Sequence, residues 1–424
     1  MSGKRVYLES LGCRLNAAEL ETLAREFAGA GYQVVGDPAD ADLILLNSCA
    51  VTAQAARKSR HRLRTLHRIT PTADLAVTGC WATDDVAGAR EMDGVRWVLP
   101  NLGKADAVTQ ITGRQSDPAP WAPGRWGHTR AFLGVQDGCD HACTYCVTRL
   151  LRGPARSRPL PDAVNRVREL VAQGAQEVVL TGVSLGSYGQ DLGLEGGLAQ
   201  LVGLLLTDTG VSRLRLSSVE PWDVDPSLLR YWQSPRLCRQ LHLPLQSGAD
   251  AVLKRMGRPT TTAAYLDLVV AARAIAPDIA LTTDVIAGFP GETDDDFAQT
   301  LDFVEKIGFS RLHVFPYSER AGTPAVRLPG KLSSAERAER ARHLRELGER
   351  LASDYRTRFL GRVLPVLWER RLETGAWAGL SDTYIEVRTH PDDAGASGDL
   401  YNRITPARVV ELANGHVVGQ VAGA

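Results

Sequence analysis

Residues 138–146 read Gly-Cys-Asp-His-Ala-Cys-Thr-Tyr-Cys, and this stretch decides how the rest of the chain is interpreted. Its three cysteines, Cys139, Cys143 and Cys146, have the spacing Cys-x3-Cys-x2-Cys. A zinc ribbon would show two well-separated pairs of ligands instead. Three thiolates on one short loop can bind three irons of a cubane [4Fe–4S] cluster and leave the fourth iron open. An open metal position indicates a working site, so the spacing predicts a catalytic iron–sulfur centre.

Two plainer interpretations of these cysteines are a structural zinc site and a set of buried thiols without metal. The chain has seven cysteines, an odd number, and in a reducing compartment they are better explained as ligands than as disulfides. The spacing favours the cluster over both alternatives.

The composition sets wider limits. The chain has 424 residues, enough for about two to four domains. It contains 49 Lys and Arg and 49 Asp and Glu, so overall charge gives no sign of nucleic acid. No apolar run approaches the roughly 20 residues that span a bilayer, and the N-terminus lacks the pattern of a secretory signal. We expect a cytoplasmic protein without a membrane partner.

Residues 1–115 alternate between strand and helix patterns, which predicts an open parallel sheet with helices on both faces. The expected strands are 6–9, 42–47 and 75–78, and the expected helices are 17–30 and 53–69.

Three cysteines follow the three strands of this domain: Cys13, Cys49 and Cys80. Ligands of open α/β sheets bind outside the carboxyl ends of the strands, so these thiols are expected to meet at one edge. Gly12 and Gly79 would let the backbone approach closely there. Three thiolates again suggest a cluster with an open iron; the alternative is three unrelated buried thiols.

The segment 57–68 carries six Lys and Arg and no acidic residue, and it begins just after Cys49. A solvated helix face usually mixes both signs of charge. This face could therefore contact phosphates, and the alternative is a merely solvated face.

A Pro- and Gly-rich connector, 116–127, precedes a second domain at 129–350. Six strand-like stretches with helical patterns between most of them predict a partial (β/α)6 TIM-like barrel. They are 131–136, 177–183, 213–219, 240–245, 279–286 and 311–317. Chemistry in such barrels sits at the carboxyl ends of the strands, and the cysteine loop follows the first strand.

Small or polar residues near other strand ends are suited to bind a nucleoside and an amino acid. Glycines allow close contact, and hydroxyls and carboxylates can hydrogen-bond ribose. The candidates are Gly182, Ser218, Glu220, Asp284 and Gly288. Asp284 could equally be a helix or turn cap. His242 and His313, on apolar strands, are expected to be core histidines, and Cys238 is expected to be structural.

Residues 333–356 predict a solvated helix rich in Glu and Arg. Beyond it, 355–424 predicts a small antiparallel β-barrel with strands at 363–368, 384–388, 408–412 and 417–421. Such barrels often bind RNA, although charge gives no support for that here.

Together these features resemble the radical S-adenosylmethionine (SAM) methylthiotransferases, whose three-domain order covers essentially the whole chain. Residues 47–52 (NSCAVT), 57–60 (RKSR) and 241–248 (LHLPLQSG) are most similar to one branch. That branch modifies N6-threonylcarbamoyladenosine (t6A) in tRNA, and the other branches act on isopentenyladenosine in tRNA or on an aspartate of a ribosomal protein. Ser48 and Ala321 depart mildly from the family pattern, and the TRAM-like end barrel is not basic.

The resemblance implies transfer of a methylthio group to carbon 2 of t6A at position 37, beside the anticodon. Cys139, Cys143 and Cys146 would bind a [4Fe–4S] cluster that produces a 5′-deoxyadenosyl radical from SAM, with Tyr145 beside the adenine of SAM. Cys13, Cys49 and Cys80 would bind a second [4Fe–4S] cluster, whose open iron holds the sulfur. SAM would serve as methyl donor and radical source. Cys13, Cys139, Cys143 and Cys146 are thus the expected catalytic residues.

The same resemblance implies two partners, the tRNA anticodon stem-loop and an electron donor such as flavodoxin or ferredoxin. It also implies a monomeric enzyme. Two alternatives of other classes remain at this point. One is a zinc-stabilised RNA-binding protein without catalysis, and the other is a radical SAM enzyme that acts on protein.

Overall fold

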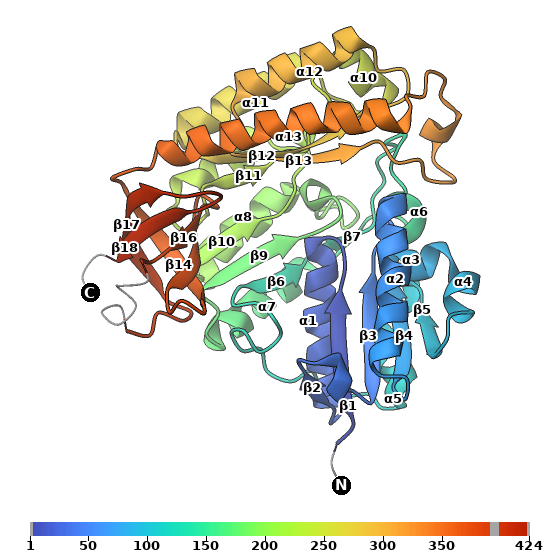
Figure 1. The fold of residues 1–424 in the computed structure, drawn as a ribbon. Coiled ribbons are helices and arrows are strands. Elements are labelled where there is room, and N and C mark those ends of the chain that lie inside the picture. Colours follow the sequence, from blue (N-terminus) through green and yellow to red (C-terminus); the bar gives the residue numbers. More distant parts are fainter. Residues whose placement is uncertain (1–2, 391–397, 422–424) are drawn as a thin grey trace.

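The computed structural model describes residues 3–390 and 398–421. Figure 1 shows an N-terminal sheet domain, a half barrel beside it, and a small closed barrel at the far end of the half barrel. The predicted fold class is confirmed. The outer bounds expected for the first and last domains, residues 1 and 424, lie outside the described residues.

The first domain is a parallel five-stranded sheet in the order β2-β1-β3-β4-β5. Its central strands are buried on both faces, which explains why β3 reads as an unbroken apolar run. Strands β2 and β5 were not predicted, because they are short or half-exposed edge strands. The bounds are β1 Arg5–Ser10, β2 Gln33–Val35, β3 Leu43–Ser48, β4 Asp74–Gly79 and β5 Val95–Leu99.

Helices cover both faces of this sheet. The two long ones are α1, Arg14–Gly29, and α2, Ala53–Ile69. The short ones are α3 Cys80–Asp84, α4 Val86–Arg90 and α5 Ala107–Thr112. Thr52 caps α2 by accepting a hydrogen bond from the backbone N–H of Ala55.

The half barrel consists of two three-stranded parallel sheets, β6-β9-β10 and β11-β12-β13. Single bridges from Leu214 to Leu237 and from Ser218 to His242 join them, so all six predicted strands form one open barrel. The strands are β6 Ala131–Gly134, β9 Glu177–Thr181, β10 Arg213–Leu216, β11 Gln240–His242, β12 Ala280–Ala287 and β13 Arg311–Pro316. A two-residue ribbon, β7 (Gln136–Asp137) with β8 (Arg156–Ser157), flanks the cysteine loop.

The helices of this domain lie on the outside of the half barrel (Figure 1), apart from the short α6, which packs against α3 of the first domain. They are α6 Thr148–Arg152, α7 Leu160–Ala172, α8 Gly197–Asp208, α9 Pro226–Leu229, α10 Asp250–Arg255, α11 Thr262–Ile275, α12 Asp294–Ile307 and α13 Ser334–Thr357. The connection from β10 to β11 uses only the short α9. None of the helices in the described residues is both long and apolar enough to cross a membrane.

The C-terminal strands form a closed barrel in the order β14-β15-β16-β18-β17. The pairs are antiparallel except for β16 with β18, which is parallel and closes the barrel. Strand β15 was not predicted. The bounds are β14 Val363–Arg371, β15 Trp377–Ser381, β16 Glu386–Arg388, β17 Ile404–Leu412 and β18 Val417–Val421.

Helix α1 joins the first domain to the half barrel, because it is buried on two sides. Leu23 and Phe27 pack into the core of the first sheet. On its other side, Ala18 packs against Phe132 of β6 and Val179 of β9. The first domain therefore lies along the β6 edge of the half barrel.

Candidate functional site

The cysteine loop sits at the carboxyl end of β6, as predicted. Thr144 anchors it: its backbone N–H donates to the carbonyl of Met256 (2.9 Å), and its hydroxyl donates to the carbonyl of Arg255 (2.9 Å). At its start, Gly138 has φ of +71° and a side chain there would overlap the carbonyl of Pro154, so only glycine fits. Protein contacts thus fix the loop at its first residue and at Thr144.

The three thiols of the loop are half-buried and close enough for their charges to interact. The pKa of Cys139 is raised to about 11, mainly by burial, with smaller contributions from the neighbouring Cys146 and Cys143. Electron-poor metal ions offset such a cost by binding the thiolate form. The donor set therefore fits an iron–sulfur cluster.

The second cysteine trio also converges, at the carboxyl ends of β1, β3 and β4. Gly12 has φ of +104°, and a Cβ there would lie 2.7 Å from the Sγ of Cys49, so the missing side chain leaves room for the thiol. Burial raises the pKa of Cys49 to about 11, with smaller contributions from Cys80 and Cys13. Cys13 is exposed, whereas the other two are buried.

Across the described residues, no three Cys, His, Asp or Glu side chains close around a single metal ion. A cubane cluster does not require that arrangement, because each thiolate binds a different iron of the cube. The two trios therefore suit a multi-iron group.

Arg152, which is 1% exposed, joins the scaffolds of the two trios. Its guanidinium donates to Asn16 (2.8 Å), in the first turn after Cys13, and to Asp137 (2.8 Å), just before Cys139. It also donates to Glu19 (2.8 Å), which pairs with Lys104 (2.6 Å). Burial opposes ionisation of Glu19, but these two cations hold its pKa at about 2. The orientation of one trio relative to the other is therefore fixed by buried ion pairs.

Two of the predicted SAM contacts, Tyr145 and Glu220, are brought together by a residue that was not predicted, Arg258. The Arg258 guanidinium donates to the Tyr145 hydroxyl (3.3 Å) and pairs with Glu220 (2.7 Å). It also lies over the ring of Trp222, with 4.7 Å to the ring centroid. The Arg258 side chain is fully buried, so it can hold both groups rigidly.

Asp284 lies within β12, which excludes the alternative role of a helix or turn cap. Its carboxylate is 3.4 Å from Nε2 of His242, whose Nδ1 bonds to the Thr282 hydroxyl (2.8 Å). Burial opposes ionisation of Asp284, yet the contact with His242 lowers its pKa overall. His242 is buried and satisfied, as expected, and burial lowers the pKa of the nearby His313 to about 4.

The remaining candidates lie against protein atoms. A Cβ at Gly182 would approach Gln136 (2.9 Å), and one at Gly288 would overlap Arg337 (2.4 Å). A side chain at either position would therefore displace its neighbour. Ser218 forms the bridge to His242 that joins the two sheets of the half barrel.

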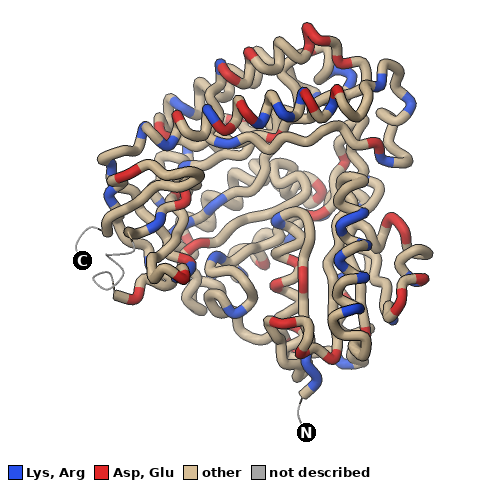
Figure 2. Tube along the Cα trace, viewed as in Figure 1, with Lys and Arg blue, Asp and Glu red and all other residues tan. Residues whose placement is uncertain are grey.

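The basic segment lies on α2, whose Lys and Arg residues form a line along the helix in Figure 2. Arg62 turns to an ion pair with Glu9 (2.7 Å), whereas Arg57, Lys58 and Arg64 are exposed. The positive face of α2 is therefore open to a partner.

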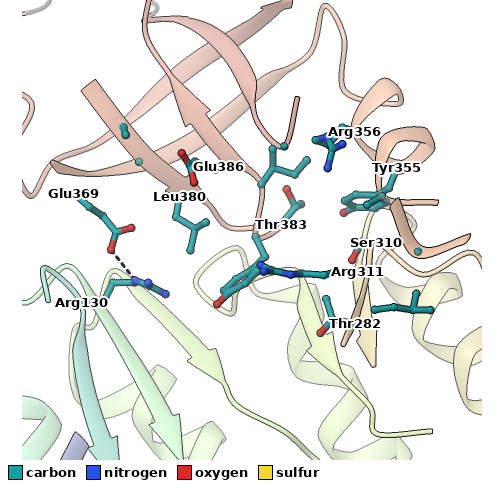
Figure 3. Close-up of a pocket in the computed structure, with 18 of the residues that line it drawn as sticks. Arg130, Thr282, Ser310, Arg311, Tyr355, Arg356, Glu369, Leu380, Thr383 and Glu386 are labelled. Carbon is teal, nitrogen blue, oxygen red and sulfur yellow. Dashed lines mark hydrogen bonds and ion pairs between the residues drawn. The ribbon is translucent and has the colours of Figure 1, made fainter. Parts of the chain in front are cut away.

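A cavity of about 720 Å³ lies where the small barrel meets the half barrel (Figure 3). Arg130, Arg311 and Arg356 line it, together with Glu369 and Glu386. A second cavity, of about 1020 Å³, lies between α1, strands β6 to β8 and helix α7.

Two family models match the chain: "Uncharacterized protein family UPF0004" over residues 5–99 and "Radical SAM superfamily" over residues 133–304. The threonylcarbamoyladenosine tRNA methylthiotransferase MtaB of Thermotoga maritima is 37% identical, and the match covers 90% of this chain and 91% of that protein. The tRNA-2-methylthio-N(6)-dimethylallyladenosine synthase of Chloroflexus aurantiacus is 34% identical, and the match covers 96% of this chain and 89% of that protein.

Among solved structures, the radical SAM methyltransferase TsrM of Kitasatospora setae is similar, with a TM-score of 0.54 and 16% identity. The likeness covers 76% of this chain and 77% of that chain. At this identity it supports the fold alone.

Proposed function

This chain belongs to the radical SAM methylthiotransferase family, and on that premise we propose that it transfers a methylthio group to carbon 2 of t6A at position 37 of tRNA. As a radical SAM enzyme it uses SAM and a [4Fe–4S] cluster. The observation that carries the substrate is the 37% identity to the t6A methylthiotransferase, over nearly the full length of both chains.

We assign the [4Fe–4S] cluster that works with SAM to Cys139, Cys143 and Cys146, and a second cluster to Cys13, Cys49 and Cys80. The convergence of each trio and the room beside Gly12 support this assignment. Carbon 2 of adenine carries an unactivated hydrogen that no side-chain base can remove near neutral pH. When bound, the clusters and SAM supply the one-electron and sulfur chemistry that this carbon requires.

The chain's own residues bind and orient the reactants. Arg258 holds Tyr145 and Glu220 in place beside the cysteine loop, where we propose that they contact SAM. Ser218, Asp284, Gly182 and Gly288 are proposed as further contacts. Arg152 keeps the first domain against the cysteine loop, and we propose that the substrate base binds between the two trios.

The exposed basic face of α2 is proposed to bind phosphates of the anticodon stem-loop, because it begins next to Cys49. We further propose domains at 1–115, 129–350 and 355–424, the last an RNA-binding TRAM-like barrel. A flavodoxin or ferredoxin would supply electrons to a monomeric enzyme in the cytoplasm, where its tRNA substrate is found.

Nucleoside mass spectrometry of tRNA from a deletion strain tests the substrate. We expect 2-methylthio-t6A to disappear and t6A to accumulate, with restoration by the intact gene. Loss of the methylthio derivative of isopentenyladenosine instead would assign the chain to that branch. An unchanged tRNA profile would point to a protein substrate, such as the ribosomal aspartate.

Metal analysis after anaerobic purification tests the remaining alternative. We expect iron and sulfide in amounts that match two clusters per chain. Zinc without iron or sulfide would instead indicate a zinc-stabilised RNA-binding protein.

A further inference from the structure

Arg14 is a guanidinium without an acidic partner at the point where the three parts of the molecule meet. It is the first residue of α1 and follows Cys13 directly. Its Nη2 donates to the hydroxyl of Tyr384 (2.6 Å), in the small barrel, and its guanidinium lies 5.1 Å from the centroid of that ring. Within residues 3–390 and 398–421, no carboxylate pairs with it.

The surroundings of Arg14 carry an excess of positive charge. Glu177 is shared by Arg213 (2.7 Å) and Arg215 (2.7 Å), and Glu369 pairs with Arg130 (2.8 Å). Four guanidiniums, with Arg14 included, thus face two carboxylates. Nearby, Arg239 pairs with Asp382, and the Asp284 carboxylate lies against His242. With these groups included, five guanidiniums still face four carboxylates.

The pKa of the Tyr384 phenol reflects the same excess of positive charge. Burial alone would raise the pKa of its phenol, yet Arg14, Arg130 and Arg215 together lower it below the usual value. A half-buried cation without a counter-ion is costly, and a bound anion removes that cost. The position of Arg14 therefore suits an anionic ligand.

The substrate proposed above carries such an anion, because the threonyl part of t6A ends in a carboxylate. We propose that Arg14 binds this carboxylate and thereby selects t6A over adenosines with an uncharged N6 substituent. This inference rests on the proposed function. The dimethylallyl group of the other tRNA branch has no charge and would leave Arg14 unpaired.

The position of Arg14 in the chain agrees with this role. Cys13 belongs to the trio proposed to hold the sulfur, so carbon 2 must approach its immediate neighbourhood. Carbons 2 and 6 of adenine both adjoin N1, and the threonylcarbamoyl group extends from N6. A side chain one residue beyond Cys13 can therefore reach that group while carbon 2 faces the thiolates.

Tyr384 acts as a positioning residue for Arg14. It lies between β15 and β16 with φ of +64°, a conformation that an aromatic residue seldom adopts. Its backbone N–H donates to the carbonyl of Ser381 (3.1 Å), which fixes the turn. Because the Tyr384 hydroxyl engages Nη2, other N–H donors of Arg14 remain for a bidentate contact with a carboxylate.

The test compares three anticodon stem-loops binding to the reconstituted holoenzyme, measured by fluorescence anisotropy at one salt concentration. They carry t6A, unmodified adenosine, or the methyl ester of t6A at position 37. For the wild-type protein we expect t6A to bind most tightly. For Arg14→Gln we expect t6A to bind about 10- to 100-fold more weakly and the other two stem-loops to bind as before.

Arg14→Lys and Tyr384→Phe serve as controls. Lysine keeps the charge and should restore most of the t6A preference. Tyr384→Phe should weaken t6A binding about 2- to 10-fold through the loss of one hydrogen bond, with no effect on unmodified adenosine. Iron content and thermal unfolding confirm that each variant is folded and loaded.

Two results would overturn the inference: a wild-type protein that does not distinguish t6A from its ester, or an Arg14→Gln protein that loses affinity for all three stem-loops equally. The second result would make Arg14 a structural contact between the first domain and the small barrel. Failure of the proposed function looks different, because the wild-type holoenzyme would then produce no 2-methylthio-t6A whatever its binding preference.

Discussion

The proposed scheme gives the two trios different tasks, and replacing Cys13 can separate sulfur transfer from the cleavage of SAM. It is exposed, whereas its partners Cys49 and Cys80 are buried. Replacing this exposed side chain disturbs little packing, and Arg152 still joins Asn16 to Asp137 in its absence. The loss of Cys13 should therefore act on sulfur transfer alone.

Cys13→Ala is expected to retain reductive cleavage of SAM and to abolish methylthio transfer. The measurements are 5′-deoxyadenosine by chromatography and 2-methylthio-t6A by mass spectrometry. Cys238→Ala is the control, because this thiol is buried near Glu177 and belongs to neither trio, and the variant should keep both activities. Methylthiolated tRNA from the Cys13→Ala protein would contradict the role of sulfur holder.

Arg258 is the second residue whose removal should have a defined effect. Arg258→Met is expected to weaken SAM binding about 10- to 100-fold, because Glu220 loses its charged partner and Tyr145 its hydrogen bond. Calorimetric titration of SAM into the reconstituted protein measures this. Arg255→Met, a change to a more exposed neighbour paired with Asp296, is the control. Equal affinity in the two variants would remove Arg258 from the site.

At the scale of elements, the charge of α2 contrasts with that of α13. Both helices are long, and both carry many arginines. On α13, however, arginines pair with acids, as Arg342 does with Glu346 (2.8 Å) and Arg350 with Glu305 (2.9 Å). On α2, Arg57, Lys58 and Arg64 are exposed on a helix without acidic residues. Of these two helices, α2 therefore presents the more positive surface to a polyanion (Figure 2).

Replacing Arg57, Lys58 and Arg64 of α2 with Gln should weaken tRNA binding and reduce its dependence on salt. Because the variant neutralises three fewer phosphates, the slope of log K against log salt should become shallower by about 2. Filter binding at several salt concentrations measures the slope. The control replaces Arg342 and Arg350 of α13 with Gln. A slope that changes equally in both proteins would argue against a phosphate contact on α2.

At the scale of the whole molecule, the contact between the first domain and the half barrel contains a carboxyl group that resists ionisation. Glu21 of α1 is 4% exposed, near Trp121 and Phe132. Burial raises its pKa to about 7, although the nearby Trp121 and Arg25 lower it somewhat. The folded protein therefore holds a proton that the unfolded chain releases above about pH 4.5.

The free energy of unfolding should consequently fall as the pH rises through the range from about 4.5 to 7. The full effect is about 3 kcal/mol, from about 1.4 kcal/mol per pKa unit. Glu21→Gln keeps the shape without the charge, so it should remove the contribution of Glu21 and leave that of Glu26, whose pKa burial also raises to about 7. The variant should be more stable than the wild type at pH 8. Urea unfolding at pH 5, 6, 7 and 8 measures both proteins, and identical pH profiles would contradict the buried carboxyl.

Much of the fold could be predicted because its signals are local. Helix 53–69 was predicted with the bounds of α2, and the structure shows that Thr52 caps its start. The six strands of the half barrel were recognised as apolar runs between helices. Strands β2, β5 and β15 were missed because a short edge strand, or one without clear alternation, carries too little pattern.

The sequence by itself determined the two cysteine trios and the strand ends that carry them, because the spacing of ligands along a loop and the alternation of strands and helices are properties of neighbouring residues. Only the tertiary structure decided what surrounds the trios. Arg258 with Glu220, Arg152 with Asn16, and Arg14 with Tyr384 join residues 38, 136 and 370 positions apart. Such polar contacts leave no periodic trace in a chain, because they exist only once packing has brought distant backbones together and excluded water from between them.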